Sequence, residues 1–387
     1  MTSPRPNQPS TPSDTRASSR TVGLDTCVVR LAPVLREPSL RYTANIQAVT
    51  STMHASSASS PNGARILLTG GLGFIGAHVL RAYLAHGCHV AVLDDASRGR
   101  REHLPPGVPL YQVDVRDVSG VMKALEAERP DVINHHAALV SVRESHLDPT
   151  GYLEVNAQGT ANMLRAALEC GARKFILASS GGAVYGNAHR LPVGEDHPLE
   201  PLSPYGVSKV HAERHVLGGP QSIEHVILRY GNVYGPGQHP NGNNGVVAIF
   251  TQQLLEGQVP QLFGAGHPLR DFVYVVDVAQ ANLRALAPGT RGVFNVGTGR
   301  GLRIAEIYAR IAAHLGVRIS PQMCPAHEFE VAENVLAVER AALELGWVAH
   351  TPFEDGLRWT VAWVQSLVAG TVAAGAVGTL SGDGAGE

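Results

Sequence analysis

Short apolar runs alternate along much of the chain with longer stretches whose apolar residues recur at helical spacing. The runs have the length expected of buried parallel strands, and the stretches between them have the length of crossover helices. The predicted strands span residues 66–68, 89–93, 108–113, 131–135, 174–178 and 223–228; the predicted helices run from about 75 to a stop at Gly87, and over 121–128, 160–170 and 210–217. Because strands alternate with helices, we predict an α/β fold with a doubly wound parallel sheet and ligands at the carboxyl ends of its strands.

The most informative motif follows the first predicted strand. The segment Thr69-Gly70-Gly71-Leu72-Gly73-Phe74-Ile75-Gly76 has glycines at G-x-x-G-x-x-G spacing. Alone, such glycines also fit a turn that merely needs positive φ. Between a strand and a helix, they point backbone N–H groups and the positive end of a helix dipole at a pyrophosphate. The motif therefore predicts a Rossmann-type dinucleotide site.

Two carboxylates after the second predicted strand identify the dinucleotide. Asp94 and Asp95 lie within the usual length of a βαβ unit from the glycine turn. A carboxylate at this point accepts hydrogen bonds from the adenosine ribose and repels a 2′-phosphate. We therefore predict NAD rather than NADP, although Arg98 and Arg100 follow closely and could weaken the preference.

Small and polar residues follow the later strands. Asp114 is a candidate partner for the adenine amino group, with Val115 beside it. His136-Ala137-Ala138 would let a flat cofactor lie close to the backbone. Ser180 follows the fifth predicted strand.

A tyrosine and a lysine supply the candidate chemistry. Tyr205 and Lys209 are four residues apart in a predicted helix and so share one face. A phenol has a pKa near 10, so a base acting near neutrality needs a shift worth roughly 4 kcal/mol. An ammonium about 5 Å away contributes on the order of 3 kcal/mol at an effective dielectric of 20, and the positive nicotinamide ring can supply the rest. Ser180 would share the substrate proton.

Composition narrows the classes of function. Hydrophobic residues make up 44% of the 387 residues, which is ample for a core, and the net charge of −2 argues against a nucleic-acid partner. No apolar run approaches the length of a bilayer span, so we expect no membrane partner. The four cysteines form no C-x-x-C pair. We therefore expect no metal site, no disulfide framework and a cytoplasmic location.

The two ends of the chain differ in composition from the rest. Residues 1–63 are rich in Ser, Thr and Pro and have few periodic apolar positions. We expect a disordered extension, or a spurious one if translation starts at Met53; an organelle transit peptide is the alternative. The Gly/Ala-rich residues 367–387 are expected to form a flexible tail.

These motifs together resemble the extended short-chain dehydrogenase/reductase family of NAD-dependent epimerases and dehydratases. The resemblance rests on the glycine turn, Asp94, Asp114, His136-Ala137-Ala138, Asn156, Ser179-Ser180 and Tyr205 with Lys209. Within that family the chain is most similar to bacterial UDP-glucose 4-epimerases, through residues 178–186, 228–236, 245–250 and 270–275. The similarity extends from about residue 64 to residue 365.

The resemblance implies an NAD-binding domain over residues 64–230. It also implies a smaller substrate-binding subdomain over 231–366, from which segments return to the NAD-binding domain. The implied cofactor contacts are Gly70, Gly73, Phe74, Ile75, Gly76, Asp94, Asp95, Asp114, Val115, His136, Ala137, Ala138, Asn156, Tyr205, Lys209 and Tyr230. The implied substrate contacts are Ser180, Asn232, Val246, Val247, Gln261, Phe263, Arg270 and His327. A homodimer through the helices at 160–170 and 205–217 is also implied.

Two departures from the family pattern lie near the C-terminus. His327 stands where the family usually has an arginine that grips the diphosphate, and residues 336–339 replace a Leu-Asp-x-Ser pattern. Weaker positive charge there would lower affinity for a UDP-sugar or admit another nucleotide. Asn334 falls near a position that gates pocket size in the family.

The predicted activity is NAD-dependent epimerisation at C4 of a nucleotide-diphosphate sugar of the UDP-glucose/UDP-galactose type. Tyr205 would act as the base, and the reaction would pass through a 4-keto sugar. Gly181-Gly182 stands where 4,6-dehydratases carry an Asp-Glu pair, which argues against dehydration. Another NAD-dependent nucleotide-sugar oxidoreductase and a non-catalytic NAD-binding regulator remain alternatives.

Overall fold

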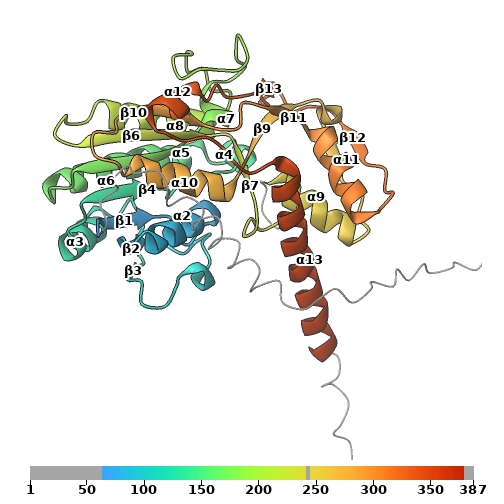
Figure 1. The fold of residues 1–387 in the computed structure, drawn as a ribbon, viewed down its shortest axis with the longest axis horizontal. Helices are drawn as coiled ribbons and strands as arrows, with labels where there is room; N and C mark the ends of the chain where they lie inside the picture. Colours follow the sequence, from blue (N-terminus) through green and yellow to red (C-terminus); the bar gives the residue numbers. More distant parts are fainter. Residues whose placement is uncertain (1–62, 241–244, 379–387) are drawn as a thin grey trace, which may run out of the picture. The chain divides into compact units, whose positions relative to one another are not determined.

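The computed structural model describes residues 63–240 and 245–378, so the predictions for residues 1–62 lie outside the described part of the chain. Its centre is a sheet of seven parallel strands, which confirms the predicted fold class (Figure 1). The strand order is β10–β6–β5–β4–β1–β2–β3, so the chain winds outward in both directions from β1. The bounds are Arg65–Thr69 for β1, His89–Leu93 for β2, Leu110–Tyr111 for β3, Val132–His135 for β4, Lys174–Ser180 for β5, Glu224–Tyr230 for β6 and Gly292–Val296 for β10.

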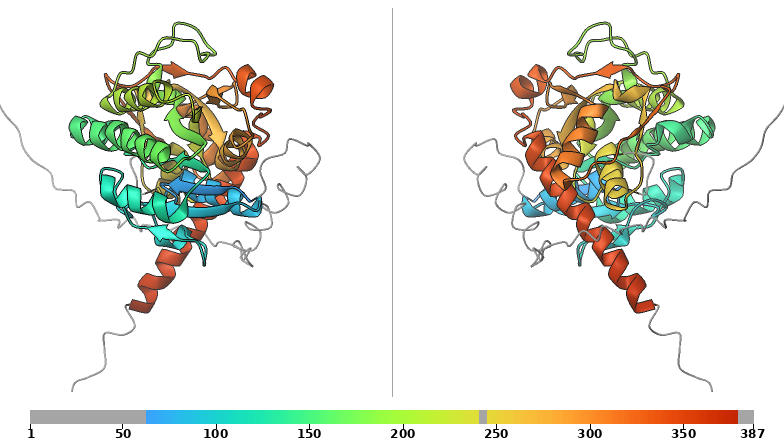
Figure 2. Two further views of the ribbon diagram at one scale, coloured as in Figure 1. Left: turned by 90° about the vertical axis from the view of Figure 1, so that its left-hand side faces the viewer. Right: turned by 90° about the vertical axis from the view of Figure 1, so that its right-hand side faces the viewer.

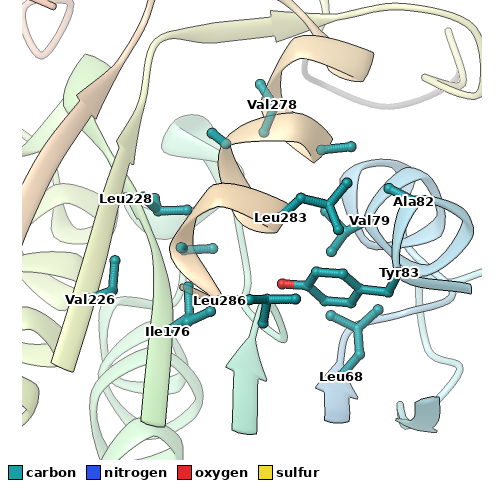
Figure 3. Packing of buried hydrophobic residues seen from close by; sticks show 14 of the residues in the cluster. Leu68, Val79, Ala82, Tyr83, Ile176, Val226, Leu228, Val278, Leu283 and Leu286 are labelled. Atoms are coloured by element: carbon teal, nitrogen blue, oxygen red, sulfur yellow. The ribbon is translucent and has the colours of Figure 1, made fainter. Parts of the chain in front are cut away.

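Helices cover both faces of this sheet, because successive strand residues point to opposite sides. Ile66 and Leu68 belong to the core beneath α2 (Phe74–Ala85) and α10 (Val275–Ala285), as Figure 3 shows for Leu68. Leu67 belongs to the opposite core, beneath α3 (Val118–Glu128), α6 (Gly159–Glu169) and α8 (Pro204–Leu217). Both faces are thus buried, and Figures 1 and 2 show the two helical layers.

The C-terminal part of the chain builds two smaller sheets over the carboxyl end of the large one. In the first, β9 (Leu269–Tyr274) pairs with β7 (Asn232–Tyr234), β11 (Gly301–Arg303) and β13 (Glu333–Asn334). The second pairs β8 (Gln261–Phe263) with β12 (Gln322–Cys324). The core here comes mainly from α9 (Val246–Leu255), α11 (Ile304–Leu315), α13 (Phe353–Gly378) and β9.

Most predicted elements occur near their expected positions, and the differences have local causes. Strand β3 has two residues rather than 108–113, because this edge strand pairs only with β2. Helix α3 begins at Val118 because the Asp117 carboxylate caps it by accepting from Gly120 N at 3.0 Å. Ser203 caps α8 in the same way, so Tyr205 falls in its first turn.

Two helical stretches are longer than expected. The helix expected at 160–170 continues a run made of α5 (Pro149–Tyr152) and a π-helical segment, Leu153–Gln158. Helix α13 extends to Gly378, into the segment expected to be a tail, where alanine favours helix. The short helices are α4 (Val142–Ser145), α7 (Gly181–Val184), α12 (Glu339–Glu344) and 3₁₀ turns at Arg101–His103 and Gly264–Gly266. No helix in the described ranges has both the length and the apolar character needed to cross a membrane.

Candidate active site

A cavity of about 1200 Å³ lies at the carboxyl ends of the large sheet, between that sheet and the C-terminal elements. It is larger than a typical small-molecule pocket, so it has room for two ligands. Of the residues predicted to bind cofactor or substrate, Asn156 alone does not line it. The others are Gly70, Gly73, Phe74, Ile75, Gly76, Asp94, Asp95, Asp114, Val115, His136, Ala137, Ala138, Ser180, Tyr205, Lys209, Tyr230, Asn232, Val246, Val247, Gln261, Phe263, Arg270 and His327.

The glycine turn is shaped to hold a pyrophosphate. Gly70 has φ +68° and packs so closely on the next strand's end that a Cβ would lie 2.7 Å from Ala137 N. A Cβ on Gly76 would lie 2.1 Å from Gly70 O, so the third glycine allows helix and turn to touch. Helix α2 begins at Phe74, on the cavity wall. Its first backbone N–H groups therefore face the position that an anion would occupy.

Asp94, the candidate partner of the ribose, lines the cavity and also shapes this turn. One oxygen accepts from Leu72 N at 3.0 Å and the other accepts from Ala96 N at 2.9 Å. Burial raises the pKa of Asp94, while these backbone hydrogen bonds lower it. Of the two arginines that could favour NADP, Arg98 pairs with Glu144 at 2.6 Å and Arg100 pairs with Glu102 at 3.1 Å. Both positive charges already have carboxylate partners.

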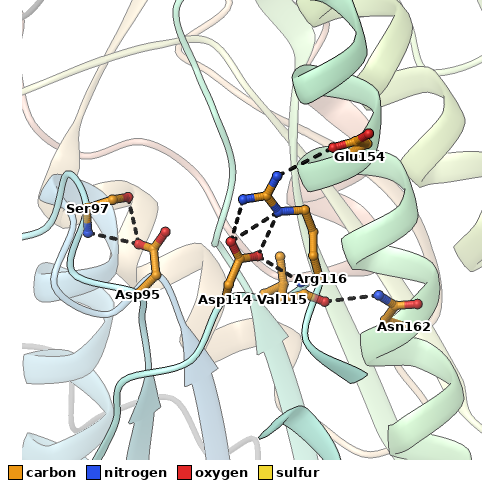
Figure 4. Close-up of polar contacts among 7 residues, drawn as sticks. All are labelled: Asp95, Ser97, Asp114, Val115, Arg116, Glu154 and Asn162. Atoms are coloured by element: carbon orange, nitrogen blue, oxygen red, sulfur yellow. Dashed lines mark hydrogen bonds and ion pairs between the residues drawn. The ribbon is translucent and has the colours of Figure 1, made fainter. Parts of the chain in front are cut away.

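Asp114 forms an ion pair at the adenine end of the cavity. Its carboxylate accepts from Arg116 Nη2 at 2.7 Å and from Arg116 N at 2.8 Å, as Figure 4 shows. The hydrogen bond from Arg116 lowers the pKa of Asp114. Val115 is buried beside it, and its carbonyl accepts from Asn162 Nδ2 at 3.1 Å. No sequence motif pointed to Arg116, which also lies 3.4 Å from Glu154.

Tyr205, Lys209 and Ser180 all line the cavity. Burial raises the pKa of Tyr205 to about 12, and a hydrogen bond with Ser180 acts in the opposite direction. Burial lowers the pKa of Lys209 to about 8, partly offset by the charge of Glu213. Among the described residues none accepts a hydrogen bond from Lys209 Nζ. The cavity is therefore lined by a buried amine with unused donors and by a phenol that burial keeps protonated.

Asn156 supports the site from outside the cavity. Its amide accepts from Leu139 N at 2.8 Å and donates to Leu139 O and to Ser208 Oγ, each at 2.9 Å. Ser208 Oγ in turn donates to Tyr205 O at 2.7 Å. Both ends of the Asn156 amide are thus engaged in fixing the first turn of α8, and its contact with the cofactor stays a prediction.

A buried polar network surrounds His136 and Tyr230, two residues that line the cavity. Thr69 Oγ1 accepts from the backbone N of His136 and of Ala137, at 3.1 and 3.0 Å. His136 Nε2 and Tyr230 Oη lie 3.0 Å apart, and Asn282 Nδ2 donates to Tyr230 Oη at 2.9 Å. Burial lowers the pKa of His136 to about 3, so the imidazole is neutral. Tyr230 and His136 were predicted as site residues from the sequence. No motif pointed to Asn282, which lies on α10.

A buried ion pair lies one helical turn beyond Lys209. Glu213 Oε2 and Arg229 Nη2 are 2.6 Å apart, and both side chains are almost completely buried. Ser179 Oγ donates to Glu213 Oε1 at 2.5 Å. Ser179 lies on β5, directly before the cavity residue Ser180, and Arg229 lies on β6, directly before the cavity residue Tyr230. The ion pair and the Ser179 hydrogen bond therefore fix α8 against β5 and β6. Sequence analysis did not identify it.

The opposite wall of the cavity comes from the C-terminal elements. Arg270 pairs with Glu330 at 3.6 Å rather than with its neighbour Asp271, which is buried and accepts from Thr298 N at 2.8 Å. Burial lowers the pKa of Arg270. Asn334 does not line the cavity; it is buried and donates to Gly181 O at 3.0 Å.

Aromatic rings stack beside Arg270. The His327 ring lies 4.5 Å from the Phe263 ring and 5.1 Å from the Phe329 ring, stacked on both. The Phe329 ring also lies 4.1 Å from that of His146, and the Arg143 guanidinium lies over the Phe263 ring, 4.5 Å from its centroid. Phe329 and Arg143 line the cavity but were not predicted, because an isolated phenylalanine or arginine carries no pattern.

Known proteins share this architecture. Residues 66–297 match the model of the NAD dependent epimerase/dehydratase family. A UDP-glucose 4-epimerase of Mycolicibacterium smegmatis is 37% identical over 311 residues, covering 78% of this chain and 99% of the relative. The structure of a Thermotoga maritima UDP-glucose 4-epimerase with UDP-glucose is 36% identical, has a TM-score of 0.77 and covers 78% of this chain and 99% of its own. A Thermus thermophilus UDP-glucose 4-epimerase in complex with NAD is 40% identical, with a TM-score of 0.75 and the same coverage.

Proposed function

The chain belongs to the NAD-dependent epimerase/dehydratase family, and we propose that it inverts the configuration at C4 of a UDP-linked hexose of the glucose/galactose type. The enzyme is an isomerase and its cofactor is NAD. The observation that carries the proposal is the position of Tyr205, Lys209 and Ser180 on the wall of one cavity, which also contains the glycine turn and Arg270.

The described residues fit NAD. The turn leaves no space for a side chain at Gly70 or Gly76, and helix α2 begins at the cavity wall. Lys209 has unused hydrogen-bond donors, and His136 Nδ1 is buried without a hydrogen-bond partner among the described residues. When bound, NAD supplies a reversible hydride acceptor for the sugar C4.

Tyr205 is the proposed base. It takes the proton from the sugar 4-hydroxyl as C4 is oxidised to the ketone, and it returns that proton when C4 is reduced on the other face. Ser180 shares the proton through its hydrogen bond with Tyr205. Because burial alone raises the pKa of the phenol, Tyr205 becomes a base only when positive charge lies near it. Lys209 supplies part of that charge below pH 8.

The direct test is to incubate the purified enzyme with UDP-galactose and follow the sugar by proton NMR. We expect UDP-glucose to form without net NADH, because each turnover regenerates the cofactor. Accumulation of NADH would identify an oxidoreductase. If the purified protein binds none of UDP-galactose, UDP-N-acetylgalactosamine and dTDP-glucose, that result would favour a non-catalytic regulator that has kept the fold.

We further propose that the enzyme is a cytoplasmic homodimer in which α6 and α8 of each subunit form the interface. Leu168 and Leu217, at the ends of these helices, have 43% and 49% of their surface exposed, although each is a large apolar residue. The chain has a mass of 40.9 kDa, and light scattering should give twice that value. Replacing both leucines with glutamate should give the monomer mass; an unchanged mass would place the interface elsewhere.

A further inference from the structure

Arg143 differs from the other arginines of the cavity. Arg98, Arg116 and Arg270 each form an ion pair with a carboxylate, at 2.6, 2.7 and 3.6 Å. Among the described residues no carboxylate pairs with Arg143; its guanidinium lies 4.5 Å over the Phe263 ring. A cation resting on an aromatic face holds its position weakly, at about 0.5–1 kcal/mol when exposed, and keeps its N–H donors available.

The position of Arg143 separates it from the adenine end of the cavity. It belongs to α4, on the wall formed by the NAD-binding half, and its ring partner Phe263 belongs to β8 on the opposite wall. Arg270, the cation on that opposite wall, is only partly available, because Glu330 shares its charge and two backbone carbonyls accept from its Nη1. If Arg270 were the only cation to bind it, a ligand with two negative charges would be only partly neutralised at this end of the cavity.

A second observation indicates a ligand at this end. His327 Nε2 and Glu330 Oε2 are both buried and have no hydrogen-bond partner among the described residues. Buried polar atoms usually find partners. His327 Nε2 can donate to a phosphate oxygen that arrives from outside the chain, whereas the Glu330 carboxylate only accepts and needs a hydroxyl or N–H of the ligand. Both residues line the cavity, and His327 stacks on the ring of Phe263, over which Arg143 also lies.

From these contacts we infer that Arg143 is a substrate-binding residue that holds the diphosphate of the nucleotide sugar from the NAD-binding half, while Arg270 holds it from the C-terminal half. This inference rests on the proposed function. Leaving Phe263 costs Arg143 little, and a guanidinium gains two charge-assisted hydrogen bonds on meeting a phosphate. Binding of the nucleotide sugar would then connect α4 with β8 through a ligand.

The experiment measures binding by calorimetry: UDP, dTDP and uridine are titrated into the NAD-loaded enzyme, and NAD is titrated into enzyme from which NAD has been removed. Arg143→Gln should weaken UDP binding by about tenfold to a hundredfold, as expected for lost hydrogen bonds to a charged group. Uridine, which lacks phosphate, and NAD should bind as to the wild type. Arg143→Lys should recover part of the loss. The matched control is Arg318→Gln, an exposed arginine outside the cavity, which should change nothing.

Each other result has a defined meaning. Equal UDP binding by the wild type and Arg143→Gln would overturn the inference and leave the proposed function intact. Weaker NAD binding with unchanged UDP binding would assign Arg143 to the cofactor's pyrophosphate and would also overturn the inference. Failure of the wild type to bind either UDP or dTDP would instead overturn the proposed function.

Discussion

Replacing Lys209 with methionine should abolish turnover and yet stabilise the protein near neutral pH. Lys209 is 5% exposed, and burial lowers the pKa of its ammonium from 10.5 to about 8. At 1.36 kcal/mol per pKa unit, keeping this lysine charged in the fold costs about 3 kcal/mol. Methionine has nearly the same length and carries no charge, so the variant avoids that cost.

The sign of the pH dependence follows from linkage. Below pH 8 the lysine is protonated in both the folded and the unfolded chain, and the full cost is present. Between pH 8 and pH 10.5 the folded lysine is neutral while the unfolded one is still charged, so the cost declines, and above pH 10.5 it is gone. The advantage of the variant should therefore fall from about 3 kcal/mol at pH 7 to about 1 kcal/mol at pH 9.5.

Urea unfolding without added NAD measures the difference at both pH values. Lys123→Met, at an exposed position of α3, is the control and should show no pH-dependent difference. Lys174→Met provides the contrast, because Lys174 is also buried but donates to Ala285 O at 2.8 Å and to Ala287 O at 2.5 Å. Removing that partnered amine should destabilise the fold. A Lys209→Met variant that is less stable than the wild type at pH 7, or whose difference does not change with pH, would refute the reasoning.

Three further substitutions test the support around the site. Asn156→Ala should lower kcat with little change in the Kd for NAD, because Asn156 fixes the turn that carries Tyr205 rather than touching the cavity; a large rise in Kd would mean direct contact. Glu213→Gln should destabilise the fold by about 3–5 kcal/mol in thermal unfolding, since it leaves Arg229 buried without its carboxylate; a loss below 1 kcal/mol would contradict this. Leu68→Ala should cost about 2–5 kcal/mol in urea unfolding by leaving a cavity under α2, and unchanged stability would show that the site collapses.

The sequence predicted the fold class and six of the seven strands of the large sheet, but not β10, and it indicated candidate residues that act through local patterns. The glycine turn, Asp94 and the Tyr205–Lys209 spacing depend on neighbours a few positions away, so periodicity and motif spacing identify them. Groups that depend on distant partners were missed: Arg116 meets Glu154, Glu213 meets Arg229, and Asn282 meets Tyr230. Their partners are brought together only by the winding of the sheet.

Dependence on distant partners also explains why the surroundings of Asn156 and His327 could not be predicted from the sequence. Asn156 stands in a recognisable motif position, but the orientation of its amide is set by Leu139 and Ser208. His327 was read as a position of lost charge; its stacking between Phe263 and Phe329 depends on how the segment from 325 to 331 lies against β8.

The central claim is that Tyr205 moves the proton of the sugar 4-hydroxyl while the cofactor is reduced and reoxidised in place. The most direct measurement is the rate of UDP-galactose to UDP-glucose conversion by Tyr205→Phe, with the Kd for NAD measured on the same preparation. The account predicts a rate lower by at least about a thousandfold, as expected for loss of a general base, with NAD binding retained. Conversion by the variant at the wild-type rate would contradict it.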